Sequence, residues 1–263
     1  MSSIRHALIT GGSRGIGLSI AHHLARNSYR ITLISRTRSA LETAVSSLPL
    51  ISPENAFGRA ANLNHAYIEG DVSLSQFWEN LNSETGDGGV EKGTVDLLVN
   101  CAGISQNSLL VRTQPSVIEN VVATNLTSVM LAVRALIKAK KFRSKDAGIG
   151  SPSVINLASL LAIKGGRGAV AYSASKAGVL GLTRALAAEC GPMGLRVNAI
   201  VPGYVETDMT KGFSPAAREE ITKHIPLKRF GTCDEIAQAA LFLATNEYAN
   251  NCVINLDGGL SAI

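Results

Sequence analysis

The sequence lacks the residue patterns of metal-binding, disulfide-linked and membrane-spanning proteins. Four cysteines are spread over 263 residues without metal-ligand spacing, at Cys101, Cys190, Cys233 and Cys252, and this sparse use indicates a reducing compartment. The five histidines form no zinc motif, so we predict no metal site. No run of about 18 apolar residues occurs, which argues against a membrane span.

An excess of basic residues is the clearest bias in composition. The net charge is +5 and the pI is about 9.1, which suits a polyanionic cofactor and an acidic partner but is too diffuse to indicate nucleic acid. One local concentration ends a helical pattern that begins near Asn125, and it comprises Lys138, Lys140, Lys141, Arg143 and Lys145. It predicts a docking patch for an acidic carrier protein, although a basic helix end also complements the helix dipole.

Short apolar runs alternate with helical patterns along the whole chain. The runs cover residues 6–10, 30–35, 66–70, 95–100, 153–158, 195–200 and 252–256. Such alternation predicts an α/β fold with a doubly wound parallel sheet of about seven strands and helices on both faces. No domain-sized linker or internal repeat occurs, so we expect residues 1–263 to form a single domain, with longer surface connections at 46–65, 84–94 and 143–152.

A glycine-rich turn follows the first apolar run. Gly11, Gly15 and Gly17 are spaced Gly-x-x-x-Gly-x-Gly between a strand pattern and a helix pattern, which is the context that a dinucleotide phosphate site requires. Gly11 permits the sharp turn, Gly15 lets a cofactor approach the backbone, and Gly17 lets helix and sheet pack closely. A purely structural turn between strand and helix is the alternative interpretation.

Tyr172 and Lys176 are four residues apart, a spacing that places both side chains on one face of a helix. An ammonium beside a phenol favours the phenolate, so Lys176 is expected to lower the pKa of Tyr172. The tyrosine then serves as a general acid that protonates a carbonyl oxygen while hydride reaches the carbon. A lone Tyr-x-x-x-Lys also occurs by chance, so this interpretation depends on the other motifs.

Five ordered motifs together resemble the short-chain dehydrogenase/reductase family. They are residues 10–17, Asn100-Cys101-Ala102-Gly103, Ser159, the Tyr172/Lys176 pair and Pro202-Gly203. The resemblance covers essentially the whole chain and implies a Rossmann-type fold. Residues 109–112, 206–211, 225–231 and 257–260 are most similar to 3-oxoacyl-[acyl-carrier-protein] reductases and the related mitochondrial carbonyl reductases. Cys101 departs from the family pattern, which usually has a second asparagine there.

The resemblance implies a nicotinamide cofactor, and one position distinguishes its two forms. Arg36 follows the second predicted strand, where NAD-selective proteins have an acidic residue for the ribose hydroxyls. A guanidinium there, with Arg14 and Arg38 nearby, suits a 2′-phosphate, so we predict NADPH/NADP+. The cofactor-binding residues expected from the family pattern are Gly11, Ser13, Arg14, Gly15, Ile16, Gly17, Arg36, Asp71, Val72, Asn100, Ala102, Gly103, Tyr172, Lys176, Pro202, Gly203, Val205 and Thr207.

The same resemblance implies a catalytic set of Ser159, Tyr172, Lys176 and Asn125. Ser159 is expected to donate to the substrate carbonyl oxygen beside Tyr172, where negative charge builds during hydride transfer. Lys176 is expected to bind the nicotinamide ribose, and Asn125 to bend its helix and hold a proton-relay water. An asparagine inside a helix also bonds to its own backbone, so Asn125 by itself would indicate a structural role.

The combined expectation is an NADPH-dependent reductase of a 3-oxoacyl thioester on acyl-carrier protein, which forms the 3-hydroxyacyl product of fatty acid biosynthesis. The alternatives are a carbonyl or quinone reductase, a ketoreductase of secondary metabolism, and a non-catalytic NADP-binding partner subunit. Residues 208–226 are the expected lid over the substrate, and their sequence does not identify a particular substrate. The resemblance also implies a homotetramer, for which the small residues after Tyr172 would allow close helix packing.

Cellular location is weakly determined by the sequence. The first predicted strand starts within about six residues of Met1, which leaves no room for a cleavable presequence. Cytoplasm and mitochondrial matrix both stay open, because the mitochondrial reductases that the chain resembles share this feature.

Two local signals near the C-terminus predict backbone structure. Thr232 and Glu235 form a Thr-x-x-Glu capping box at the start of a late helix. Asn250 and Asn251 replace a glycine common in relatives, and because asparagine tolerates left-handed backbone conformations, the turn is expected to survive.

Overall fold

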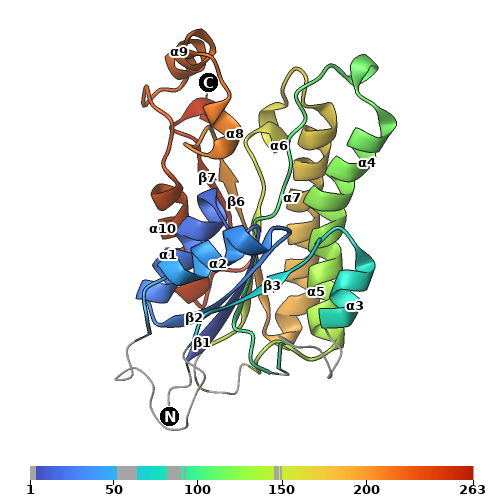
Figure 1. Ribbon diagram of the computed structural model, residues 1–263, viewed down its shortest axis with the longest axis vertical. Coiled ribbons are helices and arrows are strands. Elements are labelled where there is room, and N and C mark those ends of the chain that lie inside the picture. The colour runs from blue at the N-terminus through green and yellow to red at the C-terminus, as the bar shows by residue number, and fades with distance from the viewer. Residues whose placement is uncertain are drawn as a thin grey trace.

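A seven-stranded sheet lies at the centre of the computed structural model, which describes residues 4–51, 64–81, 90–91, 93–144, 148 and 150–262. All neighbouring strands are parallel, in the order β3-β2-β1-β4-β5-β6-β7 (Figure 1). The strands are β1 (Arg5–Thr10), β2 (Tyr29–Ser35), β3 (Ala66–Glu69), β4 (Leu97–Asn100), β5 (Ser153–Leu157), β6 (Arg196–Pro202) and β7 (Val253–Leu256). The predicted doubly wound fold is confirmed, and the predicted strand ends are displaced by at most two residues.

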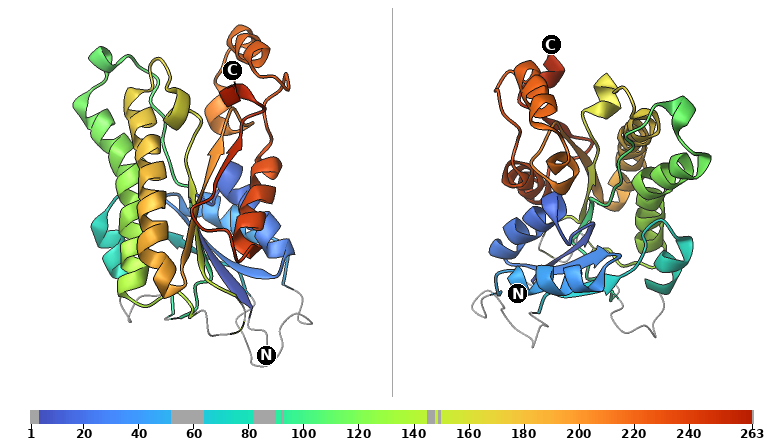
Figure 2. Two further views of the ribbon diagram at one scale, coloured as in Figure 1. Left: turned by 180° about the vertical axis from the view of Figure 1, so that it is seen from behind. Right: turned by 45° about the horizontal axis from the view of Figure 1, so that its top comes forward.

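Helices cover both faces of this sheet, as Figure 2 shows from two sides. One face carries α1 (Gly15–Arg26), α2 (Arg38–Ser47) and α10 (Cys233–Thr245); the other carries α3 (Ser75–Leu81), α4 (Pro115–Val122), the π-helical turn η3 (Ala123–Thr127), α5 (Ser128–Lys138) and α7 (Val170–Cys190). The shorter helices of the described residues are η2 (Leu110–Arg112), α6 (Leu161–Lys164), η5 (Gly191–Met193), α8 (Asp208–Lys211), α9 (Pro215–His224) and η6 (Leu260–Ala262). The central strands are buried on both sides, which explains their continuous apolar sequences.

The continuous helix Pro115–Lys138 is long and apolar enough to cross a membrane by length and composition alone. Its apolar residues have a different use in this fold. Val129, Ala132, Val133 and Leu136 are buried in the core between the sheet and neighbouring helices, and this packing accounts for part of the apolar composition of the helix.

The carboxyl ends of the central strands converge at one edge of the sheet. Thr10 of β1 lies opposite Asn100 of β4, and the chain leaves these two neighbours in opposite directions, toward β2 and toward β5. Ligands in open α/β sheets bind in the crevice that such a reversal creates. The Thr10 hydroxyl accepts hydrogen bonds from the backbone N–H groups of Cys101 (3.1 Å) and Ala102 (3.2 Å), so it fixes the turn at this crevice.

Both local predictions near the C-terminus are confirmed. The Thr232 hydroxyl accepts from the Glu235 backbone N–H at 3.2 Å, and the Glu235 carboxylate accepts from the Thr232 backbone N–H at 2.7 Å. Asn251 has φ of 60°, in the left-handed region. Its backbone N–H donates to the Val197 carbonyl at 2.8 Å, which ties the turn to the start of β6.

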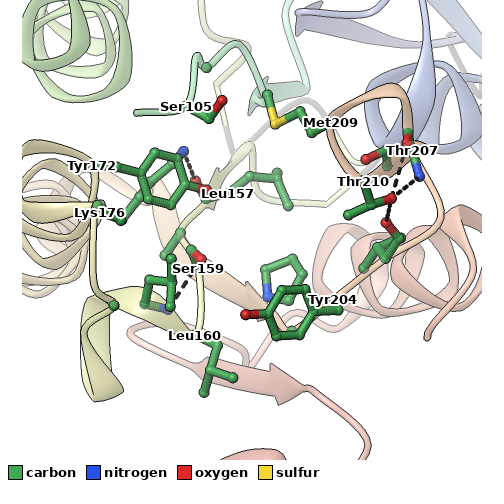
Figure 3. Close-up of a pocket in the computed structure, with 18 of the residues that line it drawn as sticks. Ser105, Leu157, Ser159, Leu160, Tyr172, Lys176, Tyr204, Thr207, Met209 and Thr210 are labelled. Carbon is green, nitrogen blue, oxygen red and sulfur yellow. Dashed lines mark hydrogen bonds between the residues drawn. The ribbon is translucent and has the colours of Figure 1, made fainter. Parts of the chain in front are cut away.

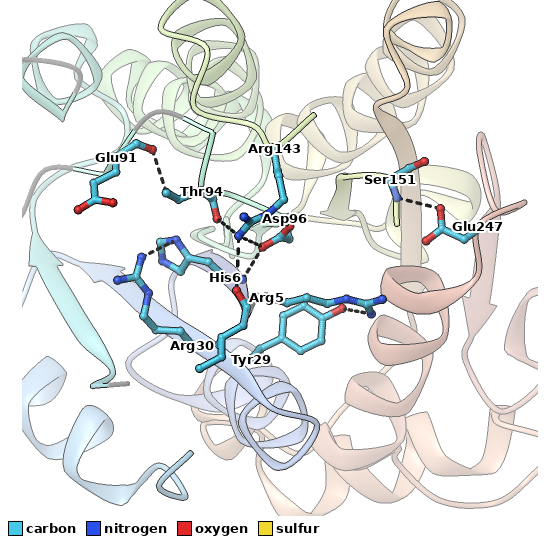
Figure 4. A network of polar contacts seen from close by, with 11 residues as sticks. Arg5, His6, Tyr29, Arg30, Glu91, Thr94, Asp96, Arg143, Ser151 and Glu247 are labelled. Carbon is cyan, nitrogen blue, oxygen red and sulfur yellow. Dashed lines mark hydrogen bonds and ion pairs between the residues drawn. The ribbon is translucent and has the colours of Figure 1, made fainter. Parts of the chain in front are cut away.

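The prediction of a basic docking patch is wrong for two of its residues. Lys141 is only 4% exposed and its ammonium donates to the Val90 carbonyl. Arg143 binds both carboxylate oxygens of Asp96, at 2.6 and 3.1 Å, within the polar network of Figure 4. Both side chains therefore bind groups inside the protein next to the amino-terminal end of β4. The spacing of charged residues in the sequence could not indicate these contacts.

Two other members of that patch, Lys138 and Lys140, lie far from the crevice. Lys138 and Lys140 are exposed, whereas Lys145 lies outside the described residues. The helix from Asn125 to Lys138 carries them about 20 Å along its axis, toward the edge where Phe142 bridges Val95. They therefore occupy the amino-terminal end of the sheet, opposite the crevice.

Candidate active site

Helix α7 places Tyr172 and Lys176 one turn apart beside the end of β5, as the spacing predicted. The Lys176 ammonium is buried and donates to the Leu157 carbonyl at 2.7 Å. Ser159 follows two residues later and lines the same pocket as Tyr172, and its hydroxyl accepts from the Leu161 backbone N–H at 3.2 Å. Figure 3 shows Tyr172, Lys176 and Ser159 together on one side of a pocket. The sheet and one helix thus bring together three of the four predicted catalytic side chains.

A cavity of about 440 Å³ opens beside these groups. Apart from the three predicted catalytic side chains, its wall is largely apolar and includes Leu160, Tyr204, Met209, Phe213 and Ile221. Tyr204 is fixed from behind, because its ring stacks on Phe230 with centroids 5.4 Å apart. Such a wall suits an acyl or other apolar group attached to the reacting carbonyl.

The expected lowering of the Tyr172 pKa is wrong in direction. Burial raises the pKa of Tyr172, and the Ser159 hydroxyl opposes this only in part. Burial also lowers the pKa of Lys176 to about 8. The sequence indicated a charged neighbour but not its desolvation, which acts on both groups. Tyr172 therefore carries its proton at neutral pH and can donate it to a carbonyl oxygen.

The pKa of Lys176 predicts a pH limit for the reaction. Because the ammonium loses its proton near pH 8, we expect kcat/KM for carbonyl reduction to fall by about tenfold per pH unit above that value. A pH–rate profile with saturating cofactor measures this decrease in kcat/KM. In Lys176→Arg the guanidinium stays charged, so the decrease should begin at higher pH. A decrease that begins at the same pH in Lys176→Arg would show that another group causes it.

Asn125 is fully buried but does not line the cavity. It lies in the π-helical turn η3, consistent with the predicted helix bend. Its side chain accepts from the Ile104 backbone N–H (2.8 Å) and donates to the Ile104 carbonyl (3.0 Å) and the Ser175 hydroxyl (3.1 Å). It thus joins the turn after β4 to the helix of Tyr172, and its expected role in a proton relay stays a prediction.

A second cavity, of about 230 Å³, lies along the glycine-rich turn. Gly15 has φ of +56°, a conformation that L side chains rarely adopt. A Cβ at Gly17 would overlap the Gly11 carbonyl oxygen, so helix α1 approaches the turn more closely than any larger residue permits. The bare backbone facing this cavity, at a helix start, fits a dinucleotide phosphate.

Nearly all the predicted cofactor residues line one of the two cavities. The smaller cavity is lined by Gly11, Ser13, Arg14, Gly15, Ile16, Gly17, Arg36, Asp71, Val72, Ala102, Gly103 and Thr207; the larger one by Ile16, Gly103, Tyr172, Lys176, Pro202, Gly203, Val205 and Thr207. Asn100 is the exception, since its buried amide donates to Asn156 at 2.9 Å instead. The shared residues show that the two cavities adjoin.

Several cavity residues were not expected from the sequence. Cys101 lines both cavities, although it was identified only as a departure from the family pattern. Burial raises the pKa of this thiol to about 12, so it is an uncharged wall group. Gln106 lines the larger cavity and carried no sequence signal, because its partner Ala171 on α7 lies 65 residues away in the chain.

The three arginines near the second strand differ in their surroundings. Arg36 lines the smaller cavity directly after β2. Arg14 also lines it and lies 3.6 Å from Asp208, the first residue of α8. Arg38 instead pairs with Glu42 at 3.0 Å on the exposed face of α2. Arg36 and Arg14 are therefore the cations available to a cofactor phosphate.

A glycine-lined cavity adjoining a group of Tyr172, Ser159 and the buried Lys176, at the switch point of a parallel sheet, defines a nicotinamide-dependent oxidoreductase. The chain belongs to the short-chain dehydrogenase/reductase family. Residues 11–261 match the family model described as "Enoyl-(Acyl carrier protein) reductase", which spans both cavities and all the residues that line them.

Similar proteins bear two kinds of name. Carbonyl reductase family member 4 of Danio rerio is 36% identical over 98% of this chain and 99% of that protein. The 3-oxoacyl-[acyl-carrier-protein] reductase of Homo sapiens is 36% identical over 97% of each chain. Among solved structures, the Pseudomonas aeruginosa RhlG/NADP active-site complex superposes with a TM-score of 0.85 at 31% identity, covering 98% of this chain and 97% of the other.

Proposed function

We propose that the protein is an NADPH-dependent reductase that converts a 3-oxoacyl thioester on acyl-carrier protein to the 3-hydroxyacyl form. The observation that carries the proposal is the catalytic group itself, in which Ser159, Tyr172 and Lys176 face a largely apolar cavity that adjoins a dinucleotide-shaped one. The human relative named 3-oxoacyl-[acyl-carrier-protein] reductase supports the substrate class.

Each residue of the site has its own role in carbonyl reduction. A bound nicotinamide supplies the hydride that the carbonyl carbon receives. Ser159 donates a hydrogen bond to the carbonyl oxygen, where negative charge develops, and Tyr172 transfers its phenolic proton to that oxygen. The Lys176 ammonium stabilises the phenolate that remains. The apolar wall keeps water from the reacting carbon and strengthens these charge interactions.

NADPH is the proposed cofactor because of Arg36. We expect Arg36→Asp to lower kcat/KM for NADPH by about 10- to 100-fold, since it removes a charge-assisted phosphate contact, and to leave kcat/KM for NADH equal or higher. The matched control is Arg38→Gln, which alters the guanidinium paired with Glu42 and should change neither value. Steady-state kinetics with both cofactors measure this, and an unchanged NADPH/NADH ratio in Arg36→Asp would contradict the assignment.

An acidic carrier needs a basic contact surface, and exposed cations lie at both ends of the sheet. Lys138 and Lys140 lie at the end of the sheet opposite the crevice. Arg167 lies at the other end, where it lines the rim of the larger cavity. We propose Arg167 as the principal contact, because a carrier docked there delivers its thioester directly to Tyr172.

The test uses acetoacetyl thioesters attached to acyl-carrier protein and to free pantetheine. Arg167→Glu should raise KM at least about tenfold for the carrier-bound substrate and leave the pantetheine substrate unchanged. The double variant Lys138→Glu/Lys140→Glu reports on the other surface. Reduction of the pantetheine thioester with no preference for the carrier would remove the carrier from the proposal. Turnover of quinones or small ketones alone would favour a carbonyl reductase, the name of the Danio rerio relative.

We also propose a homotetramer in which one face of α7 forms a contact between subunits. Ala174, Ala177, Gly181 and Ala185 are exposed along that helix, and small residues allow a second helix to approach closely. Gly178 has a different role, because a Cβ there would meet Leu126 of the same chain at 2.7 Å. Light scattering of Gly181→Trp, compared with the unmodified protein, tests whether that face mediates assembly.

A further inference from the structure

We infer that Gln106 is a positioning residue for Tyr172, which caps the catalytic helix from the loop after β4 and joins that helix to the wall of the substrate cavity. The inference rests on the proposed function only in that Tyr172 is the proton donor. Gln106 is 3% exposed and lines the larger cavity, yet no sequence motif includes it.

Helix α7 begins without a cap of its own. Its N-cap residue is Ala169, which has no side-chain acceptor for the first backbone N–H groups. The Gln106 side-chain carbonyl takes that place, accepting from the Ala171 N–H at 2.7 Å and from the Tyr172 N–H at 3.4 Å. One of the two amides held in this way belongs to the catalytic tyrosine itself.

The nitrogen of the same side-chain amide holds the loop after β4, part of which forms the cavity wall. The Gln106 Nε2 donates to the Ser108 carbonyl at 3.1 Å and to the Thr113 hydroxyl at 2.9 Å. The Ser108 backbone N–H in turn donates to the Gly168 carbonyl at 3.1 Å, just before α7. The loop after β4 and the start of α7 are therefore joined twice, and Gln106 contributes to both ends of the connection.

Only an amide can serve both sets of partners. The carbonyl oxygen faces two N–H donors, whereas the Nε2 faces a carbonyl and a hydroxyl, so the orientation of the side chain is determined by its partners. Glutamate would keep the acceptor for the helix but lose the donor for the loop. Methionine has a similar volume but would lose both the acceptor and the donor. Comparing the two substitutions therefore separates the connection to the helix from the connection to the loop.

The position of Tyr172 depends on the connection between Gln106 and the start of α7, because Tyr172 is the third residue of that helix. Its phenol reaches Ser159 and the substrate carbonyl only while the first helical turn stays in place. A displacement of about 1 Å at a reacting group lowers turnover by about 100-fold. The smaller cavity, along the glycine-rich turn, is lined by neither Ala171 nor Gln106, so the contacts that hold the cofactor phosphates should not depend on this cap.

The experiment compares Gln106→Met, Gln106→Glu and the matched control Gln114→Leu, an exposed glutamine of the same segment. With acetoacetyl-pantetheine, Gln106→Met should lower kcat by about 10- to 100-fold with NADPH affinity unchanged. Gln106→Glu should recover kcat to within about threefold of the unmodified protein but retain a raised KM, because the loop loses its donor. Gln114→Leu should change neither constant.

A second readout does not require turnover. Carbon-13 labelling at Cζ of tyrosine, with Tyr172→Phe to assign the signal, reports the surroundings and titration of the Tyr172 phenol by NMR. Gln106→Met should move that titration midpoint by about half a pH unit or more, and Gln106→Glu should restore it. An unmoved Tyr172 signal in folded Gln106→Met, or a Gln106→Glu variant as impaired as Gln106→Met, would overturn the inference. A protein that reduces no thioester but shows the expected NMR shifts would instead contradict only the proposed substrate.

Discussion

Replacing Tyr172 with phenylalanine is expected to lower kcat for carbonyl reduction by about 10²- to 10⁴-fold, the range for loss of a positioned general acid. The ring still fills the same half-buried position, but no proton remains to meet the developing charge on the carbonyl oxygen. Because the pKa of this phenol is raised by burial, the unmodified tyrosine is protonated throughout the neutral range. The loss should therefore be nearly independent of pH below about 8, where Lys176 stays charged.

The matched control for this variant is Tyr204→Phe. Tyr204 lines the same cavity, and its ring keeps the stack on Phe230 without the hydroxyl. We expect kcat to stay within about threefold of the unmodified protein. Fluorescence titration with NADPH should give unchanged affinity for both variants. Equal losses in Tyr172→Phe and Tyr204→Phe would contradict the assignment of Tyr172 as the proton donor.

Asp96→Ala is expected to lower the free energy of unfolding by about 3–5 kcal/mol, the usual effect of removing one partner of a buried ion pair. The side chain of Asp96 is 9% exposed and that of Arg143 is 16% exposed. The carboxylate also accepts from the His6 backbone N–H at 2.7 Å. The substitution leaves a buried guanidinium and a buried backbone donor without this partner, and both lie at the start of the central strands (Figure 4).

Urea denaturation followed by circular dichroism measures this loss. Asp208→Ala is the control, because Asp208 also forms ion pairs, with Lys211 and Arg14, but at the exposed surface, where such pairs contribute less than about 1 kcal/mol. Asp96→Ala/Arg143→Met should recover part of the lost stability, since it removes the unpaired charge. A loss no larger than that of Asp208→Ala would show that the pair is not structurally important.

The sequence by itself determined the features that depend on local spacing. Gly11, Gly15 and Gly17 indicated a close turn before a helix, and the structure has the turn with the helix packed against it. The four-residue spacing of Tyr172 and Lys176 placed both on one helix face. Alternating apolar runs gave the parallel sheet, because strands buried on both faces must be apolar throughout. Each of these features is encoded within a few neighbouring residues.

Only the tertiary structure decided the features that depend on burial and on residues distant in the chain. Lys141 and Arg143 looked like surface charges until their partners Val90 and Asp96 were placed beside them. The pKa of Tyr172 is raised and not lowered, because desolvation is the largest effect on it and depends on everything packed around the phenol. The cap that Gln106 supplies to α7 joins segments 65 residues apart, and no local pattern encodes a contact of that kind.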